Sequence, residues 1–117
     1  MAYLTIIGKT TVARLYAKAL TSLQVLPGDH FIETTGSRLS HGGVTEVKDH
    51  LKQLENAGGG VYFIDEAYQL TEGHNHGGKP VLDYLLAEIE NLVGKVIFVF
   101  AGYKKQVSTM PPAPSNN

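Results

Sequence analysis

Short runs of apolar residues alternate along the chain with longer stretches in which apolar residues recur every three or four positions. The short runs are rich in β-branched and aromatic residues, which is typical of buried strands. They are Leu4 to Ile7, Phe31 to Thr35, Val61 to Ile64 and Val96 to Phe100. The run from Val61 to Ile64 is continuous rather than alternating, which indicates a strand covered on both faces, as in a parallel sheet.

Three segments between these runs have the spacing of amphipathic helices. Their predicted buried positions are Val12, Tyr16, Ala19, Leu20 and Leu23 in the first, Val44, Val47, Leu51 and Leu54 in the second, and Leu82, Leu85, Leu86 and Ile89 in the third. Pro27-Gly28 ends the first helix and the glycines at 58–60 end the second, while Pro80 fits the first turn of the third. We expect loops at 36–43 and 71–79.

Strands that alternate with helices of this length predict right-handed crossovers and a parallel sheet. The expected fold is therefore α/β, a three-layer αβα arrangement with about four strands. The periodic pattern stops near residue 106, so we assign 1–106 to one domain. The proline-rich segment 107–117 is predicted to be disordered.

Composition removes several classes of function. The 117 residues carry a net charge of -1, so no basic field indicates nucleic acid. There is no cysteine, which excludes disulfides, thiolate metal sites and a cysteine nucleophile. No apolar run approaches the roughly 18 residues of a membrane span. We expect an intracellular, cytoplasmic protein that binds neither membrane nor nucleic acid.

A first candidate cluster, Gly8-Lys9-Thr10-Thr11, lies where a strand meets a helix. A helix N-terminus offers unpaired N–H groups and partial positive charge, which suit a phosphate. Lys9 would reach the β- and γ-phosphates of a nucleotide, and the Thr10 hydroxyl would ligate Mg²⁺. The alternative is an ordinary helix start capped by threonine.

A second cluster, Asp65-Glu66, follows the buried strand that begins at Val61. Open α/β sheets bind ligands at the carboxyl ends of their strands. Asp65 would hold the Mg²⁺ shell, and Glu66 would orient or deprotonate an attacking water. The alternative is a polar strand end facing solvent. The two clusters together, in this order, favour a site for ATP with Mg²⁺.

Four stretches that contain these clusters resemble the AAA+ ATPases, and within them the CbbX-like group that includes Rubisco activase and sporulation stage V protein K relatives. They are GKTTVARLYAKAL, FIETTGSRL, GGGVYFIDEAYQL and LLAEIENLVGKVIFVFAGYKKQ. The resemblance implies a P-loop NTPase-type core, ATP hydrolysis with Lys9 and Glu66 as catalytic residues, a hexameric or other oligomeric assembly, and a protein substrate. It also implies a helical lid domain, for which we expect no counterpart after residue 106.

The sequence departs from that family at the phosphate-binding loop. The pattern Gly-x-x-x-x-Gly-Lys-Thr would place its first glycine where Tyr3 stands, and the Gly-Thr pair that the family carries within this loop would fall at Ile6 and Ile7. A left-handed backbone costs an ordinary residue roughly 1–2 kcal/mol, and more for a β-branched one. Residues 2–7 cannot be both strand and loop, so we suspect that normal N-terminal residues were lost, for example through a truncated gene model.

Three functions therefore remain open. The first is an ATP-hydrolysing module of a protein-remodelling ATPase. The second is a degenerate, non-catalytic interaction module, and the third is a truncated product without an independent role. Arg14 and Arg38 would suit phosphate contacts, but salt bridges are favoured for both.

Overall fold

The computed structural model describes residues 3–7, 10–24, 26–71 and 77–102. Its elements alternate between strand and helix, as the sequence predicts. They are β1 (Tyr3–Ile7), α1 (Thr10–Ser22), β2 (His30–Thr35), α2 (Gly36–Asn56), β3 (Gly60–Asp65), the short 3₁₀ helix η1 (Ala67–Leu70), α3 (Gly78–Asn91) and β4 (Val96–Gly102). The segment 107–117, expected to be disordered, lies outside the described residues.

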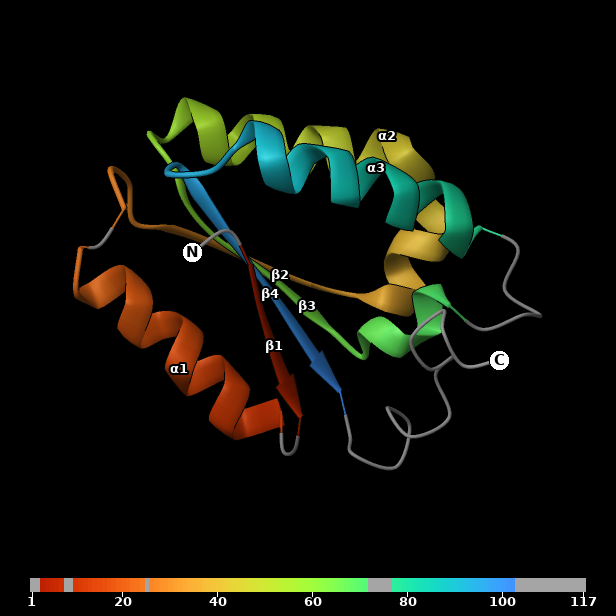
Figure 1. Cartoon of the computed structure of the whole chain (residues 1–117), viewed down its shortest axis with the longest axis horizontal. Coiled ribbons are helices and arrows are strands. Elements are labelled where there is room, and N and C mark those ends of the chain that lie inside the picture. Colours follow the sequence, from red (N-terminus) through yellow and green to blue (C-terminus); the bar gives the residue numbers. More distant parts are fainter. Residues whose placement is uncertain (1–2, 8–9, 25, 72–76, 103–117) are drawn as a thin grey trace.

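The four strands form one sheet in the order β1-β4-β3-β2, and every neighbouring pair is parallel. Helix α1 lies on one face of this sheet, while α2 and α3 lie side by side on the other (Figure 1). The expected αβα fold is thus confirmed. Among the described residues, no helix has the length and apolarity needed to cross a membrane.

The face of the sheet under α2 and α3, here called the two-helix face, carries the larger core. Tyr62 on β3 and Phe98 on β4 are fully buried there, and their rings meet edge to face at 5.9 Å between centroids. From the helices, Val47, Leu51 and Leu54 pack against them as predicted. On α3 the buried positions are Val81, Leu85 and Ile89, whereas Leu86 is exposed, contrary to prediction.

The opposite face, here called the α1 face, has a smaller core built on small helix residues. Ala13 and Ala17 are the buried positions of α1, and they let its backbone approach Phe63 and Val99 closely. The predicted buried stripe of this helix is therefore wrong. Its members Val12, Tyr16 and Leu23 are exposed, Ala19 is exposed, and only Leu20 packs partly against the core.

The apolar residues of α1 occupy a wider arc of the helix circumference than the sheet can cover. With 100° per residue, Ala13 and Ala17 lie on one side of that arc and Val12, Tyr16 and Leu23 on the other. The sheet takes up the alanine side, because larger residues would hold the helix further away. Together with Leu15, the exposed residues form what we call the α1 stripe; Leu15 and Leu23 are 64% and 70% exposed.

The segment predicted as a loop at 36–43 is the first part of α2. Thr35 caps this helix, since its hydroxyl accepts a hydrogen bond from the Arg38 N–H at 3.0 Å. Leu39 is completely buried and anchors this first part to the core. The helix is interrupted at Gly43, whose φ of 75° is a left-handed conformation that glycine adopts without strain. The glycines therefore mark a break within a helix rather than a loop before one.

Candidate functional site

Because all four strands are parallel, their carboxyl ends share one edge of the sheet, here called the carboxyl edge. Strand β1 and strand β3 each pair with β4, and Thr5 and Ile64 both lie level with Phe100. Asp65 therefore lies at the height of Ile6, two strands away, which is about 10 Å across the sheet. The start of α1 and the end of β3 are thus at the same edge (Figure 1).

The first predicted cluster is described only in part. Gly8 and Lys9 lie outside the described residues, Thr10 begins α1, and Thr11 is exposed in its first turn. That first turn contains no acidic residue. The partial positive charge of the helix N-terminus is therefore not offset there, which leaves it suited to an anion.

The question whether residues before Gly8 form strand or loop is settled by the pairing of β1. Ile7 pairs with Gly102, and α1 begins at Thr10. Only residues 8 and 9 connect the strand to the helix. A P-loop surrounds its phosphates with a longer glycine-rich connection. Next to β1, the described residues offer a phosphate the backbone N–H groups at the N-terminus of α1.

The second predicted cluster is fully described. Asp65 ends β3 half-buried, and its Oδ1 accepts a hydrogen bond of 2.8 Å from the Glu66 N–H. Glu66 has φ 51° and ψ 44°, in the left-handed region. This conformation costs an L-residue roughly 1–2 kcal/mol. It turns the chain sharply out of the sheet, so that Glu66 follows Asp65 at the carboxyl edge.

Neighbouring elements hold Glu66 in this conformation. Its carbonyl accepts a hydrogen bond from the Gln69 N–H of η1 at 3.1 Å. On the other side, Gly36 lies so close that a Cβ there would be 2.5 Å from the same carbonyl oxygen. A side chain at Gly36 would therefore push α2 away from Glu66. Gly36 and η1 are features of this site that sequence reasoning did not identify.

Arg14 and Glu33 form a salt bridge between α1 and β2. Arg14 Nη2 lies 2.6 Å from Glu33 Oε2, and Nε lies 3.0 Å from Oε1. The bridge raises the pKa of Arg14, first through the hydrogen bond and then through the charge of Glu33. The prediction that Arg14 forms a salt bridge is confirmed. Glu33 itself was missed, although it follows Phe31 at the two-residue spacing that places both on the same face of β2.

A second polar chain runs along α2 over the two-helix face. Arg38 Nε contacts Glu46 at 2.8 Å, which confirms a salt bridge for Arg38 too, and Glu46 lies 3.7 Å from His50 Nε2. His50 Nδ1 is 2.8 Å from the hydroxyl of buried Tyr62. Burial lowers the pKa of His50, against the opposing charges of Glu46 and Asp49, and burial raises the pKa of Tyr62. Burial thus favours the neutral form of His50.

The donors at the carboxyl edge suit Mg²⁺ shared with phosphate better than Mg²⁺ held by protein alone. Within the described ranges no three His, Asp or Glu residues gather as a metal cage. Protein sites that bind Mg²⁺ with a nucleotide commonly supply one or two carboxylates, and phosphates and water supply the rest. Asp65 is one such carboxylate at a strand end, so the residues present fit the metal of a nucleotide complex.

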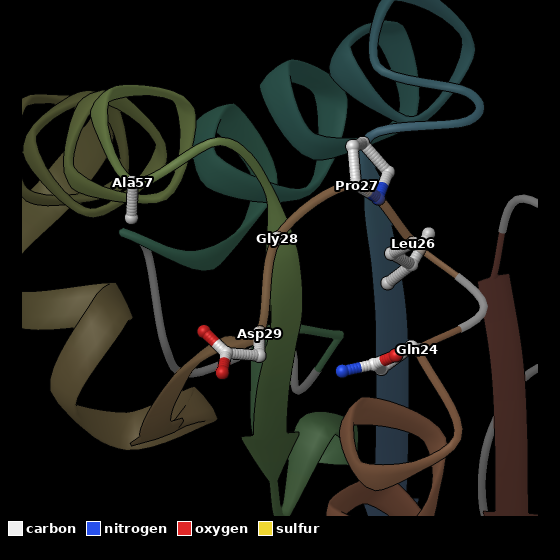
Figure 2. Close-up of a pocket in the computed structure, with 6 residues that line it drawn as sticks. All are labelled: Gln24, Leu26, Pro27, Gly28, Asp29 and Ala57. Atoms are coloured by element: carbon white, nitrogen blue, oxygen red, sulfur yellow. The ribbon is translucent and has the colours of Figure 1, made fainter.

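The described residues also line a cavity of about 500 Å³. Figure 2 shows Gln24, Asp29 and Ala57 around it, at the ends of α1 and α2. This is the edge where β2 and β3 begin, opposite Asp65 and Glu66. The cavity is therefore separate from the candidate site, and none of the predicted site residues lines it.

Comparisons with known proteins show the family to which this sequence is similar. The sequence pattern of the ATPase family associated with various cellular activities (AAA) matches residues 6–115. The chain is 37% identical over 109 residues to the ESX-1 secretion system protein EccA1 of Mycolicibacterium smegmatis, covering 88% of this chain and 19% of that protein. It is 39% identical over 103 residues to the chloroplastic ribulose bisphosphate carboxylase/oxygenase activase of Cyanidioschyzon merolae, covering 86% and 35%.

A third relative is stage V sporulation protein K of Bacillus subtilis, 36% identical over 106 residues. The match covers 86% of this chain and 32% of that protein. The chain thus spans about a fifth to a third of the length of these curated relatives. The family match at residues 6–115 includes the positions of both candidate clusters.

Proposed function

We propose that this chain, which belongs to the ATPase family associated with various cellular activities (AAA), binds ATP with Mg²⁺ at its carboxyl edge and hydrolyses it. Gly8, Lys9, Thr10 and Thr11 would bind the phosphates. Thr10 and Asp65 would hold Mg²⁺. Lys9 and Glu66 would act in catalysis.

One observation carries this proposal: the parallel register that brings the start of α1 and the end of β3 to the same edge, with only β4 between them. A nucleoside triphosphate is long enough to extend from the helix N-terminus to a metal beside Asp65. If the two clusters lay at opposite edges of the sheet, a single nucleotide could not contact both of them.

The chemistry would be electrostatic for the most part. Mg²⁺, when bound with ATP, supplies charge stabilisation to the phosphoryl group. Asp65 would orient the metal, and its Oδ1 is already fixed by the Glu66 N–H. Glu66 would accept a hydrogen bond from the attacking water and take its proton. Its left-handed backbone, held by η1 and Gly36, sets where the carboxylate emerges.

A second function is favoured by the short connection between β1 and α1. With only residues 8 and 9 between Ile7 and Thr10, the described backbone does not surround a triphosphate. A chain of this kind would assemble with complete AAA relatives without turnover, as a non-catalytic interaction module. The two functions differ in whether ATP binds at all.

The wider role is proposed from the relatives. The family resemblance implies an oligomer, a hexamer in particular, that acts on a protein substrate. Both would fit a module of a protein-remodelling ATPase. The names of the matched proteins refer to secretion, to sporulation and to the activation of a carboxylase. Of these names, that of the activase refers to action on another protein.

Calorimetry of Mg-ATP binding separates the two functions. Lys9→Ala should weaken binding about tenfold or more, because a charge-assisted contact contributes roughly 1.5–3 kcal/mol. Lys95→Ala is the matched control, since Lys95 is exposed and precedes β4 at the opposite edge. Glu66→Gln should keep binding and lower turnover by roughly 10²–10⁴. No binding heat from the parent chain at millimolar ATP would leave the non-catalytic module.

A further inference from the structure

Three charged side chains gather beneath the first half of α1, close to the carboxyl edge. Arg14 reaches down from the helix to Glu33 on β2, and its guanidinium contacts both carboxylate oxygens. Both side chains are about one third exposed, at 37% and 34%. A paired, two-contact geometry of this kind is the strongest form of an arginine–carboxylate bridge.

The third charge is Asp65. Glu33 lies level with Phe63, and Phe63 and Asp65 point to the same face of β3 because they are two residues apart. Asp65 is therefore the diagonal neighbour of Glu33, with about 8 Å between their Cα atoms. The charge of Asp65 also contributes, after Glu33, to the raised pKa of Arg14. Arg14 thus lies within the electrostatic reach of both carboxylates.

Glu33 is unusual for its surroundings. The other strand residues of the α1 face that pack against this helix are apolar, among them Val61, Phe63 and Val99. Without Glu33 the Arg14 guanidinium would be left to water and to the next carboxylate within its electrostatic reach. That next carboxylate is Asp65, the proposed Mg²⁺ ligand.

We propose that Glu33 holds Arg14 away from Asp65, and that the Arg14–Glu33 pair is a positioning device that prevents the Arg14 guanidinium from competing with Mg²⁺ at the Asp65 carboxylate. This inference rests on the proposed function of Asp65 as a metal ligand. Neither residue is catalytic. A salt bridge that only fastens α1 to β2 would use the same contacts, and its loss would alter the Mg²⁺ requirement only through loss of structure.

The decisive experiment is a Mg²⁺ titration of fluorescent ATP-analogue binding in three variants. In Glu33→Gln the freed guanidinium competes for Asp65, so the Mg²⁺ concentration at half-saturation should rise at least about fivefold, the lower end of coupling between sites. In the double variant Arg14→Gln/Glu33→Gln the competitor is gone, and the Mg²⁺ requirement should return to within about twofold of the parent.

The matched control is Glu46→Gln, which frees an arginine, Arg38, on the two-helix face. It makes the same charge change and should leave the Mg²⁺ requirement unchanged. A purely structural salt bridge predicts a different pattern. Both variants that lack Glu33 should lose thermal stability, and the Mg²⁺ requirement of the double variant should not return to the parent value. Either that lack of recovery or an unchanged requirement in Glu33→Gln would overturn the proposal.

A nucleotide-free measurement keeps this test separate from the proposed function. The Arg14 Nε–H signal in a ¹⁵N NMR spectrum should be protected from exchange in the parent by Glu33. In Glu33→Gln it should remain protected, and that protection should vanish when Asp65→Asn is added. If the parent binds no nucleotide, the proposed function fails while this result still decides the placement of Arg14. Free exchange of the signal in Glu33→Gln alone would contradict the inference.

Discussion

The two faces of the sheet are built on different principles. On the two-helix face, large side chains such as Tyr62 and Phe98 fill a thick layer between the strands and α2 and α3. On the α1 face, Ala13 and Ala17 bring a single helix down onto the strands, and the α1 stripe is exposed. Stability is therefore concentrated on the first face, while the charged residues Arg14, Glu33 and Asp65 gather on the second.

The largest effect is expected from the centre of the two-helix face. Phe98→Ala removes a fully buried ring that packs against Tyr62, and it should lower the free energy of unfolding by about 3–5 kcal/mol. Urea unfolding followed by circular dichroism measures this loss. A loss below about 1 kcal/mol would mean that this face is not the main source of stability.

A smaller effect is expected where α1 touches the sheet. Ala17 is fully buried, so Ala17→Leu must lift the helix or displace its neighbours, at a cost of roughly 1–3 kcal/mol. Ala19→Leu is the control, because Ala19 is an exposed residue of the same helix. Equal unfolding free energies for the two variants would contradict the close approach of α1.

The polar chain on the two-helix face predicts a dependence of stability on pH. Burial lowers the pKa of His50 below its unfolded value near 6.5. The unfolded state therefore binds the proton more readily, so stability is complete above pH 6.5 and declines as pH falls through 6.5 towards the folded pKa. Glu46 and Asp49 favour the charged form and Arg38 opposes it.

His50→Gln should remove this part of the pH dependence, because glutamine does not titrate and still offers Tyr62 a hydrogen-bond partner. Thermal unfolding of both proteins between pH 5 and pH 8 measures the difference. Parallel curves for parent and variant across that range would show that His50 is not the group responsible.

The smallest effect is expected on the α1 stripe. Leu15→Gln and Leu23→Gln change exposed side chains, and each should alter the free energy of unfolding by less than about 0.5 kcal/mol. The same denaturation measurement applies. A loss above about 1 kcal/mol would mean that another part of the protein covers the stripe in solution.

The sequence predicts more of the sheet than of the helices. A continuous apolar run such as Val61 to Ile64 indicates a strand that is buried on both faces. The hydrophobic pattern therefore predicts the four strands and the positions in the sequence of the two clusters that follow them. For α1, periodicity shows that an apolar arc exists but not which side of it meets the sheet. That choice depends on side-chain size, because the alanines permit the closest approach.

The remaining differences come from contacts between distant residues. The cap of Thr35 and the burial of Leu39 make 36–42 helical despite its glycines. At the candidate site, strand alternation carries Glu33 to the face where Arg14 lies, but only the packing of α1 brings the two together. The left-handed conformation of Glu66 depends in the same way on η1 and Gly36.

At position 66 the residue that would favour thermal stability differs from the residue that the proposed hydrolysis needs. Glycine adopts φ 51° without the steric penalty that glutamate bears there, so Glu66→Gly would relieve up to about 1–2 kcal/mol of strain, less the flexibility it adds to the unfolded chain. Directed evolution for heat resistance alone would tend to recover glycine or asparagine here and discard the carboxylate. A thermostable library should therefore be screened for this exchange before any of its members is chosen for enzymology.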